Sequence, residues 1–171
     1  MNITINLMYP TVLLISIHHK YASMIFEGEK QVEFRRVKPR QLNEGDLILV
    51  YATSPEQALV GVLEVDKVVE MPPHQLWKKV KDKAGISYEI FNNYYKNSHT
   101  AFAIFFKKPF SFDSPIKLER LREEWSDFRP PQCYHYLKER EINLIKSITN
   151  YDILSLSEKF NVDQTELLPK L

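Results

Sequence analysis

Short strands joined by tight connections fill much of the first half of the chain, and this pattern restricts the fold more than any other feature. Residues 11–17 (TVLLISI) and 47–52 (LILVYA) are apolar on both faces, which is typical of strands buried inside a sheet. Residues 58–69 predict a longer strand, in which Gly61 indicates a bend or a bulge. Because regular crossover helices do not separate these strands, the pattern favours a mixed, barrel-like sheet of the α+β class over a doubly wound parallel fold.

Helices are predicted around these strands. Tyr21 and Ile25 lie four residues apart in a helical pattern, and Gly28 stands where a helix commonly ends. The phenylalanine-rich segment 100–112 predicts one further strand. The other expected segments are helices at 75–83, 87–95 and 137–148, a strand end with a helical turn at 116–124, and an amphipathic stretch at 153–160. We expect one domain over residues 1–149, and residues 150–171 as a C-terminal helical extension or tail.

The composition is that of an ordinary globular domain. Its 171 residues, 44% hydrophobic and 26% charged, suffice for one domain with its own core. The formal net charge is +1, so a nucleic-acid partner must be held by a local patch. The one cysteine, Cys133, excludes an internal disulfide and a cysteine-rich zinc site. Residues 1–17 lack the marks of a secretion signal and no run of about 18 apolar residues occurs, so we expect a cytoplasmic protein without a membrane partner.

The segment 28–35 (GEKQVEFR) carries the clearest chemical pattern. A glycine turn leads into a strand that starts near Lys30 and places Glu33 and Arg35 on one face, with Val32 and Phe34 on the other. Glu33 and Arg35 are two residues apart, about 7 Å along a strand, so both can reach one ligand. An arginine beside a carboxylate favours its ionised form, and Lys30 can meet a phosphate or a carbonyl. An ordinary charge ladder on a solvated strand face has the same spacing.

The same segment resembles the GxKxxExR signature of the ASCH domain family without a gap. The flanking segments IHHKYA (17–22), GDL (45–47), YATSP (51–55) and ALVG (58–61) are similar in order to those of the family, and the likeness covers roughly residues 12–148. A late segment, FRPPQ (128–132), is similar to one in a subset of members. The resemblance implies a fold related to the PUA domain, a β-barrel that binds RNA, with Lys30, Glu33 and Arg35 lining a cleft. It also implies that the chain binds RNA or acts in transcription coactivation.

Two enzymatic branches of the family provide an alternative. One branch hydrolyses an acetyl amide on a modified cytidine with the signature lysine, a threonine and a separate glutamate. Lys30 matches the lysine, but Glu33 stands where that branch has the threonine, so Ser54 or Tyr51 would have to supply a hydroxyl. Other members are ribonucleases, and in that case Glu33 is the general base and Lys30 stabilises charge on the phosphorane.

Further polar residues are candidates for ligand contacts. A basic patch continues after the signature with Arg36, Lys38 and Arg40. Such a patch suits contacts to phosphate, and it equally suits a basic edge that is exposed to solvent. His18 and Lys20 precede a helix, where together with the helix N-terminus they can donate hydrogen bonds to a phosphate. The side chains of adjacent histidines point in different directions, so we expect no metal site. Arg129 and Gln132 lie in a proline-stiffened segment that either closes the pocket or packs over the rim. The candidate ligand-binding residues are His18, Lys20, Lys30, Glu33, Arg35, Arg36, Tyr51, Ser54, Arg129 and Gln132.

Three hypotheses follow. The first is a binding module for RNA or a nucleotide, in RNA metabolism or transcription regulation, that needs no cofactor. The second is a hydrolase that uses the same pocket, either a ribonuclease or an acetylcytidine-type amidohydrolase with Lys30 and Glu33 as catalytic residues. The third is a protein-interaction module in transcription that relies on residues 150–171.

Overall fold

Three adjacent strands form the centre of the molecule. The computed structural model of the chain describes residues 10–107 and 109–156. Strand β3 (Leu47–Ala52) runs parallel to β1 (Val12–Ile17) and antiparallel to β4 (Ala58–Met71). Every residue of β3 is buried, which confirms that the two-sided apolar pattern marks a strand covered on both faces.

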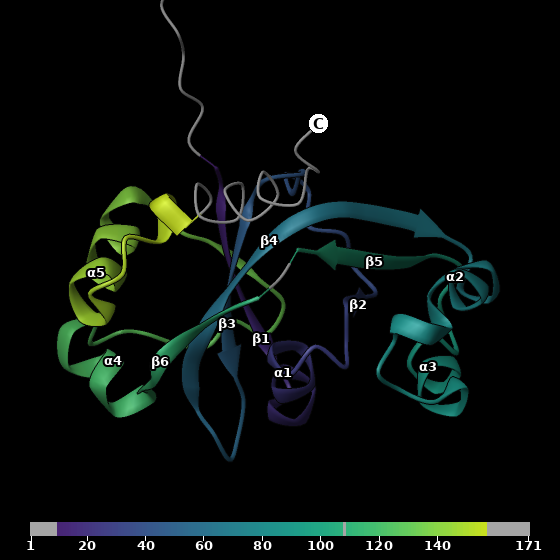
Figure 1. Ribbon diagram of the computed structural model, residues 1–171, viewed down its shortest axis with the longest axis horizontal. Helices are drawn as coiled ribbons and strands as arrows, with labels where there is room; N and C mark the ends of the chain where they lie inside the picture. The colour runs from purple at the N-terminus through teal and green to yellow at the C-terminus, as the bar shows by residue number, and fades with distance from the viewer. Residues whose placement is uncertain (1–9, 108, 157–171) are drawn as a thin grey trace, which may run out of the picture.

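The long strand β4 connects two parts of the sheet. Its first half pairs with β6 (Phe110–Lys117), and its second half pairs with β5 (Ala101–Phe106). Strand β5 also pairs with β2 (Val32–Arg35), and the short β7 (His135–Tyr136) pairs with β1. The order is β2-β5-β4-β3-β1-β7, with β6 beside β4, and β4 sweeps across the whole molecule in Figure 1.

This mixed seven-stranded sheet with flanking helices confirms the α+β class, but the sheet does not close into the expected barrel. Strands β2 and β7 end the hydrogen-bonded path, and no backbone pairing joins them within the described residues. The prediction of one strand over 100–112 is also wrong. The chain leaves β5 after Phe106 and returns as β6 along another stretch of β4, and the buried Phe105 of β5 and Phe112 of β6 belong to separate apolar clusters.

Helices cover the two ends and the middle of the sheet, as Figure 1 shows. Helix α1 (His19–Phe26) packs near β3, and Gly28 follows it with a φ of 85°, as expected for a residue just past a helix end. One end of the sheet carries α2 (Pro73–Val80), the 3₁₀ helix η1 (Lys81–Lys83) and α3 (Tyr88–Tyr94). The other end carries α4 (Leu118–Glu124) and α5 (Glu139–Thr149). The predicted helices are therefore confirmed, with shifted ends.

Gly61 lies where the pairing of β4 changes register, which confirms the predicted irregularity. The ladders to β3 and to β6 both shift next to this residue. A β-carbon at Gly61 would stand 2.3 Å from the Phe110 carbonyl oxygen and 2.6 Å from the Phe26 ring. A glycine is needed because the backbone of β6 and the end of α1 both press against β4 at this point.

The chain after α5 continues along the core at the α4–α5 end of the sheet. Asn150 ends α5 in the left-handed conformation, and Ile153 and Leu156 are buried in the same apolar cluster as Leu49 and Ile145. The remainder of the predicted 153–160 stretch, and most of the predicted 150–171 extension, lie outside the described residues. The boundary at 149/150 stays a prediction. None of the described helices has the length and apolar character to cross a membrane.

Candidate functional site

The turn after α1 carries the signature lysine into the interior. Gly28 reverses the chain, and the Lys30 amide then donates to the Met24 carbonyl at 3.0 Å. The next amide, of Gln31, donates to the Lys83 carbonyl at 2.9 Å, which fastens the start of β2 to η1. Lys30 is therefore enclosed between α1, β2 and the α2–α3 connection, and it is 2% exposed.

The Lys30 ammonium has few polar neighbours. Nζ donates to the Ala84 carbonyl at 3.1 Å and stands 4.4 Å from the centroid of the Phe34 ring and 5.7 Å from that of Tyr21. Burial is the largest influence and lowers the pKa of Lys30, the Glu33 carboxylate acts in the opposite direction, and Arg35 lowers the pKa further. A lysine with a lowered pKa in a cleft is suited to proton transfer.

Arg35 joins the two open edges of the sheet through its side chain. Its Nη2 lies 3.1 Å from Glu33 Oε1 and donates to the Ser16 carbonyl of β1 at 3.0 Å. Its Nη1 donates to the Cys133 carbonyl at 3.3 Å, just before β7. The guanidinium thus bridges β2 to β1 and to the β7 segment, where a closed barrel would have backbone hydrogen bonds.

A pocket of about 230 Å³ opens at this junction. The end of β1, the start of α1, β2 and α3 all contribute to its wall. Its lining residues are Ser16, Ile17, His18, Tyr21, Lys30, Glu33, Phe34, Arg35, Ile86, Ile90 and Tyr94. Two atoms of these lining residues, Ser16 Oγ and Arg35 Nε, are buried without a hydrogen-bond partner among the described residues. The volume is below the roughly 300–1,000 Å³ of common small-molecule sites, so it suits one phosphate or one base rather than a whole dinucleotide.

The structure brings four of the sequence-predicted residues together in this pocket: His18, Lys30, Glu33 and Arg35. Arg36 is exposed beside it, with its guanidinium carbon 5.0 Å from the centroid of the Tyr94 ring. Lys20 is exposed on α1 and does not line the pocket. What these residues bind stays a prediction.

Other predicted candidates lie away from this pocket. Tyr51 is wrong as a ligand-binding residue because it is 2% exposed and packs against Phe128 in the core. Ser54, Arg129 and Gln132 are exposed and contribute nothing to the pocket lining. Sequence reasoning missed Ser16, Ile90 and Tyr94, which no local pattern connects to the signature, because they reach the pocket only through the fold.

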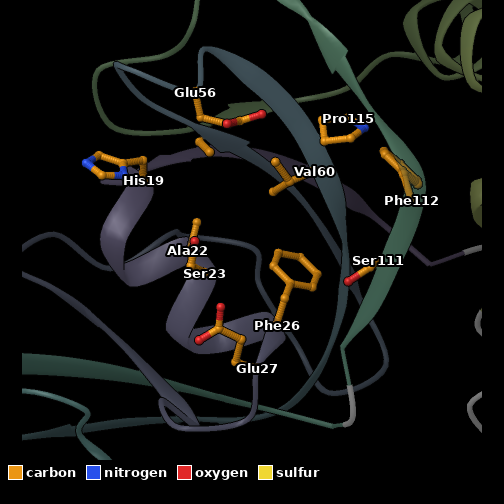
Figure 2. A pocket seen from close by; sticks show the side chains of 11 residues that line it. His19, Ala22, Ser23, Phe26, Glu27, Glu56, Val60, Ser111, Phe112 and Pro115 are labelled. Carbon is orange, nitrogen blue, oxygen red and sulfur yellow. The ribbon is translucent and has the colours of Figure 1, made fainter.

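A second pocket, of about 410 Å³, lies on another side of α1 (Figure 2). Side chains of α1 face β4 and β6 across it, with Phe26, Val60 and Phe112 forming apolar walls. Its lining carries the carboxylates of Glu27 and Glu56 and neither lysine nor arginine. Carboxylates repel phosphate, so this pocket is the poorer candidate for a nucleic-acid ligand.

Comparison with known proteins agrees with the signature. The sequence profile of the ASCH domain matches residues 15–110, more than half of the chain. The chain belongs to the ASCH domain family. This ASCH domain is 30% identical over 139 residues to a protein of Zymomonas mobilis named ASCH domain-containing ribonuclease, a match that covers 80% of this chain and 91% of that protein.

The fold of this ASCH domain is also similar to solved structures. The crystal structure of ASCH from Zymomonas mobilis matches with a TM-score of 0.75 and 28% identity, over 81% of this chain and 95% of that one.

A second relative is similar in sequence over part of its length. The large ribosomal subunit protein uL22 of Ureaplasma parvum is 29% identical over 127 residues. That match covers 74% of this chain and 39% of the Ureaplasma protein.

The lowered pKa of Lys30 predicts how stability depends on pH. The folded protein holds this proton less tightly than the unfolded chain does, where the pKa is near 10.5. Burying the protonated amine therefore lowers the stability of the folded protein. This loss is fully present below the folded pKa and disappears as the pH rises toward the unfolded pKa, so stability rises with pH in this window. We expect the unfolding free energy of the wild type, relative to Lys30→Met, to rise as the pH increases toward the unfolded pKa near 10.5. Urea unfolding of both proteins across this pH range measures the difference. Tyrosine ionisation affects both proteins alike and cancels in the difference. A difference in unfolding free energy that does not change with pH would contradict the expectation.

Proposed function

We propose that this ASCH domain binds RNA in the 230 Å³ pocket and cleaves a phosphodiester bond there. The main support is the placement of a buried ammonium, Lys30, in the same pocket as the Glu33 carboxylate. Lys30 and Arg35 carry two positive charges against one carboxylate, so the pocket attracts a phosphate although the net charge of the chain is only +1. The relative named as a ribonuclease, matched over 91% of its length, points in the same direction.

The chemistry that suits these groups uses the ribose 2′-hydroxyl as the nucleophile, so the protein need not supply one. Glu33 takes the 2′-hydroxyl proton as O2′ forms its bond to phosphorus. The bond from phosphorus to the 5′-oxygen breaks, which leaves a 2′,3′-cyclic phosphate and a 5′-hydroxyl. Lys30 donates to a phosphorane oxygen and gives its proton to the departing 5′-oxygen, a transfer made easier by its lowered pKa.

Binding without cleavage is the second candidate. Glu33 is held by Arg35 at 3.1 Å, and a carboxylate fixed in this way can equally accept from a base amino group. Hydrolysis of acetylcytidine is a third reading. Ser16 is among the lining residues, with its Oγ buried, whereas Tyr51 and Ser54, the hydroxyl residues considered from the sequence, are not. A role in transcription with a protein partner depended on residues 150–171, most of which lie outside the described residues.

Incubation of the purified chain with labelled single-stranded RNA, and separately with N4-acetylcytidine, distinguishes these functions. Fragments ending in a 2′,3′-cyclic phosphate support the ribonuclease. RNA that is bound but unchanged supports the binding module, and released acetate supports the amidohydrolase.

Removal of the lysine should weaken RNA binding. We expect Lys30→Ala to reduce RNA affinity by roughly 1.5–3 kcal/mol, the typical contribution of a hydrogen bond to a charged group. Fluorescence anisotropy with an uncleavable RNA measures this change. Lys107→Ala is a matched control, because Lys107 is also partly buried in an ion pair, with Glu64 at 2.6 Å, but does not line the pocket. Unchanged affinity in a folded Lys30→Ala protein would contradict the proposed site.

A further inference from the structure

Helix α3 places apolar side chains at the mouth of the pocket. Ile90 and Tyr94 lie four residues apart, on the same face of the helix, and both line the pocket. Their side chains are 45% and 37% exposed, although most large apolar residues of the described chain are covered. An exposed apolar surface beside a charged pocket is typical of a binding surface.

The ring of Tyr94 is held in place from behind. It packs edge-to-face against Tyr95, with centroids 4.8 Å apart, and its hydroxyl lies 3.5 Å from the Phe34 carbonyl. Tyr95 is buried, and its hydroxyl lies within hydrogen-bond distance of the Arg35 and Phe102 carbonyls. Because α3 is anchored to β2 and β5 in this way, the exposed part of Tyr94 is a preformed surface that loses little entropy on binding.

Arg36 adds a second planar group at the same place. Its guanidinium carbon lies 5.0 Å from the centroid of the Tyr94 ring, within the range of a cation–π contact. Tyr94 lines the pocket that holds Lys30 and Glu33, so the Arg36 guanidinium in contact with its ring lies beside the mouth of that pocket. Aromatic rings and guanidinium planes are the two kinds of surface on which proteins stack unpaired bases.

We propose that Tyr94, together with Arg36 and Ile90, stacks an unpaired base of single-stranded RNA at the pocket mouth, next to the phosphate held at Lys30. This inference rests on the proposed function and names its substrate class. In a duplex each base face is covered by its neighbours, so the platform can take a base only where the strand is single. The pocket volume of 230 Å³ fits the same conclusion, because it admits one phosphate or one base and no double helix.

Affinity measurements on the full chain test the platform. The probe is a 2′-fluoro RNA of about ten nucleotides, which lacks the hydroxyl needed for cleavage, offered as a single strand and as the annealed duplex. The wild type should prefer the single strand, and Tyr94→Ala should bind it about 5- to 150-fold more weakly. Tyr94→Phe, which keeps the ring, should bind as the wild type does. Tyr88→Ala is the matched control, since Tyr88 lies on the same helix and is 54% exposed, but does not line the pocket.

The outcomes separate this inference from the proposed function. Equal affinities of wild type and Tyr94→Ala, with Lys30→Ala still weakened, would overturn the platform and leave the pocket as the RNA site. Absence of RNA binding by the wild type would overturn both. If Tyr94→Ala fails to fold, Tyr94→Leu retains an apolar side chain of useful volume, and wild-type affinity in that variant would also overturn the platform.

Discussion

Glu33→Gln is expected to slow RNA cleavage by about 10²- to 10⁴-fold, the usual contribution of a general base. Glutamine keeps the size of the side chain but cannot take the 2′-hydroxyl proton. RNA binding should remain, because the change removes a negative charge from a site that attracts phosphate. Single-turnover cleavage of a labelled RNA, with the folded fraction measured in parallel, gives the rate of the chemical step.

The chain offers a closely matched control for this experiment. Glu64 on β4 is also buried and also forms an ion pair, with Lys107, but it does not line the pocket. Glu64→Gln should therefore lower stability while leaving the cleavage rate of the folded protein unchanged. Full turnover by Glu33→Gln would exclude Glu33 as the base and would mean that another group takes the 2′-hydroxyl proton.

The second large effect concerns stability. Arg35→Met is expected to lower the free energy of unfolding by about 3 kcal/mol, because it leaves the buried Glu33 carboxylate without its cation. This value is at the lower end for a broken buried ion pair, since both side chains retain some exposure. The change also removes the side-chain bridge from β2 to the Ser16 and Cys133 carbonyls.

Urea unfolding of three variants separates these contributions. Lys38→Met breaks an exposed pair with Glu70, at 3.6 Å, and should change stability by less than about 1 kcal/mol. The double variant Glu33→Gln with Arg35→Met should be more stable than Arg35→Met alone, because the unpaired charge is gone. A loss below about 1 kcal/mol for Arg35→Met would show that the open sheet edges do not depend on this guanidinium.

Several features of the fold are predictable because their causes are local. The two-sided apolar pattern of 47–52 identifies a central strand, since polar residues would appear at every second position of a half-exposed one. Gly28 marks the end of α1 because its positive φ is a backbone requirement that glycine meets without strain. The signature residues themselves are recognisable because they are contiguous in the chain.

Other features depend on contacts between distant segments. The phenylalanine run at 100–112 looks like one strand, and only its pairing with two stretches of β4 divides it into β5 and β6. Tyr51 lies next to polar loop residues in the sequence, yet Phe128 and the surrounding core cover it. Strand β7 has two residues and exists because β1 offers an edge, so it has no sequence pattern of its own.

The sequence by itself determined that Glu33 and Arg35 share one face of a strand that follows the glycine turn and Lys30, because alternation along a strand needs no knowledge of the rest of the protein. Only the tertiary structure decided that Lys30 is buried against Ala84 and Phe34, that Arg35 bridges the open edges of the sheet, and that α3 brings Tyr94 to the pocket. The physical reason is that desolvation and cavity walls arise from segments more than fifty residues apart, here β2 and α3, which no local pattern connects.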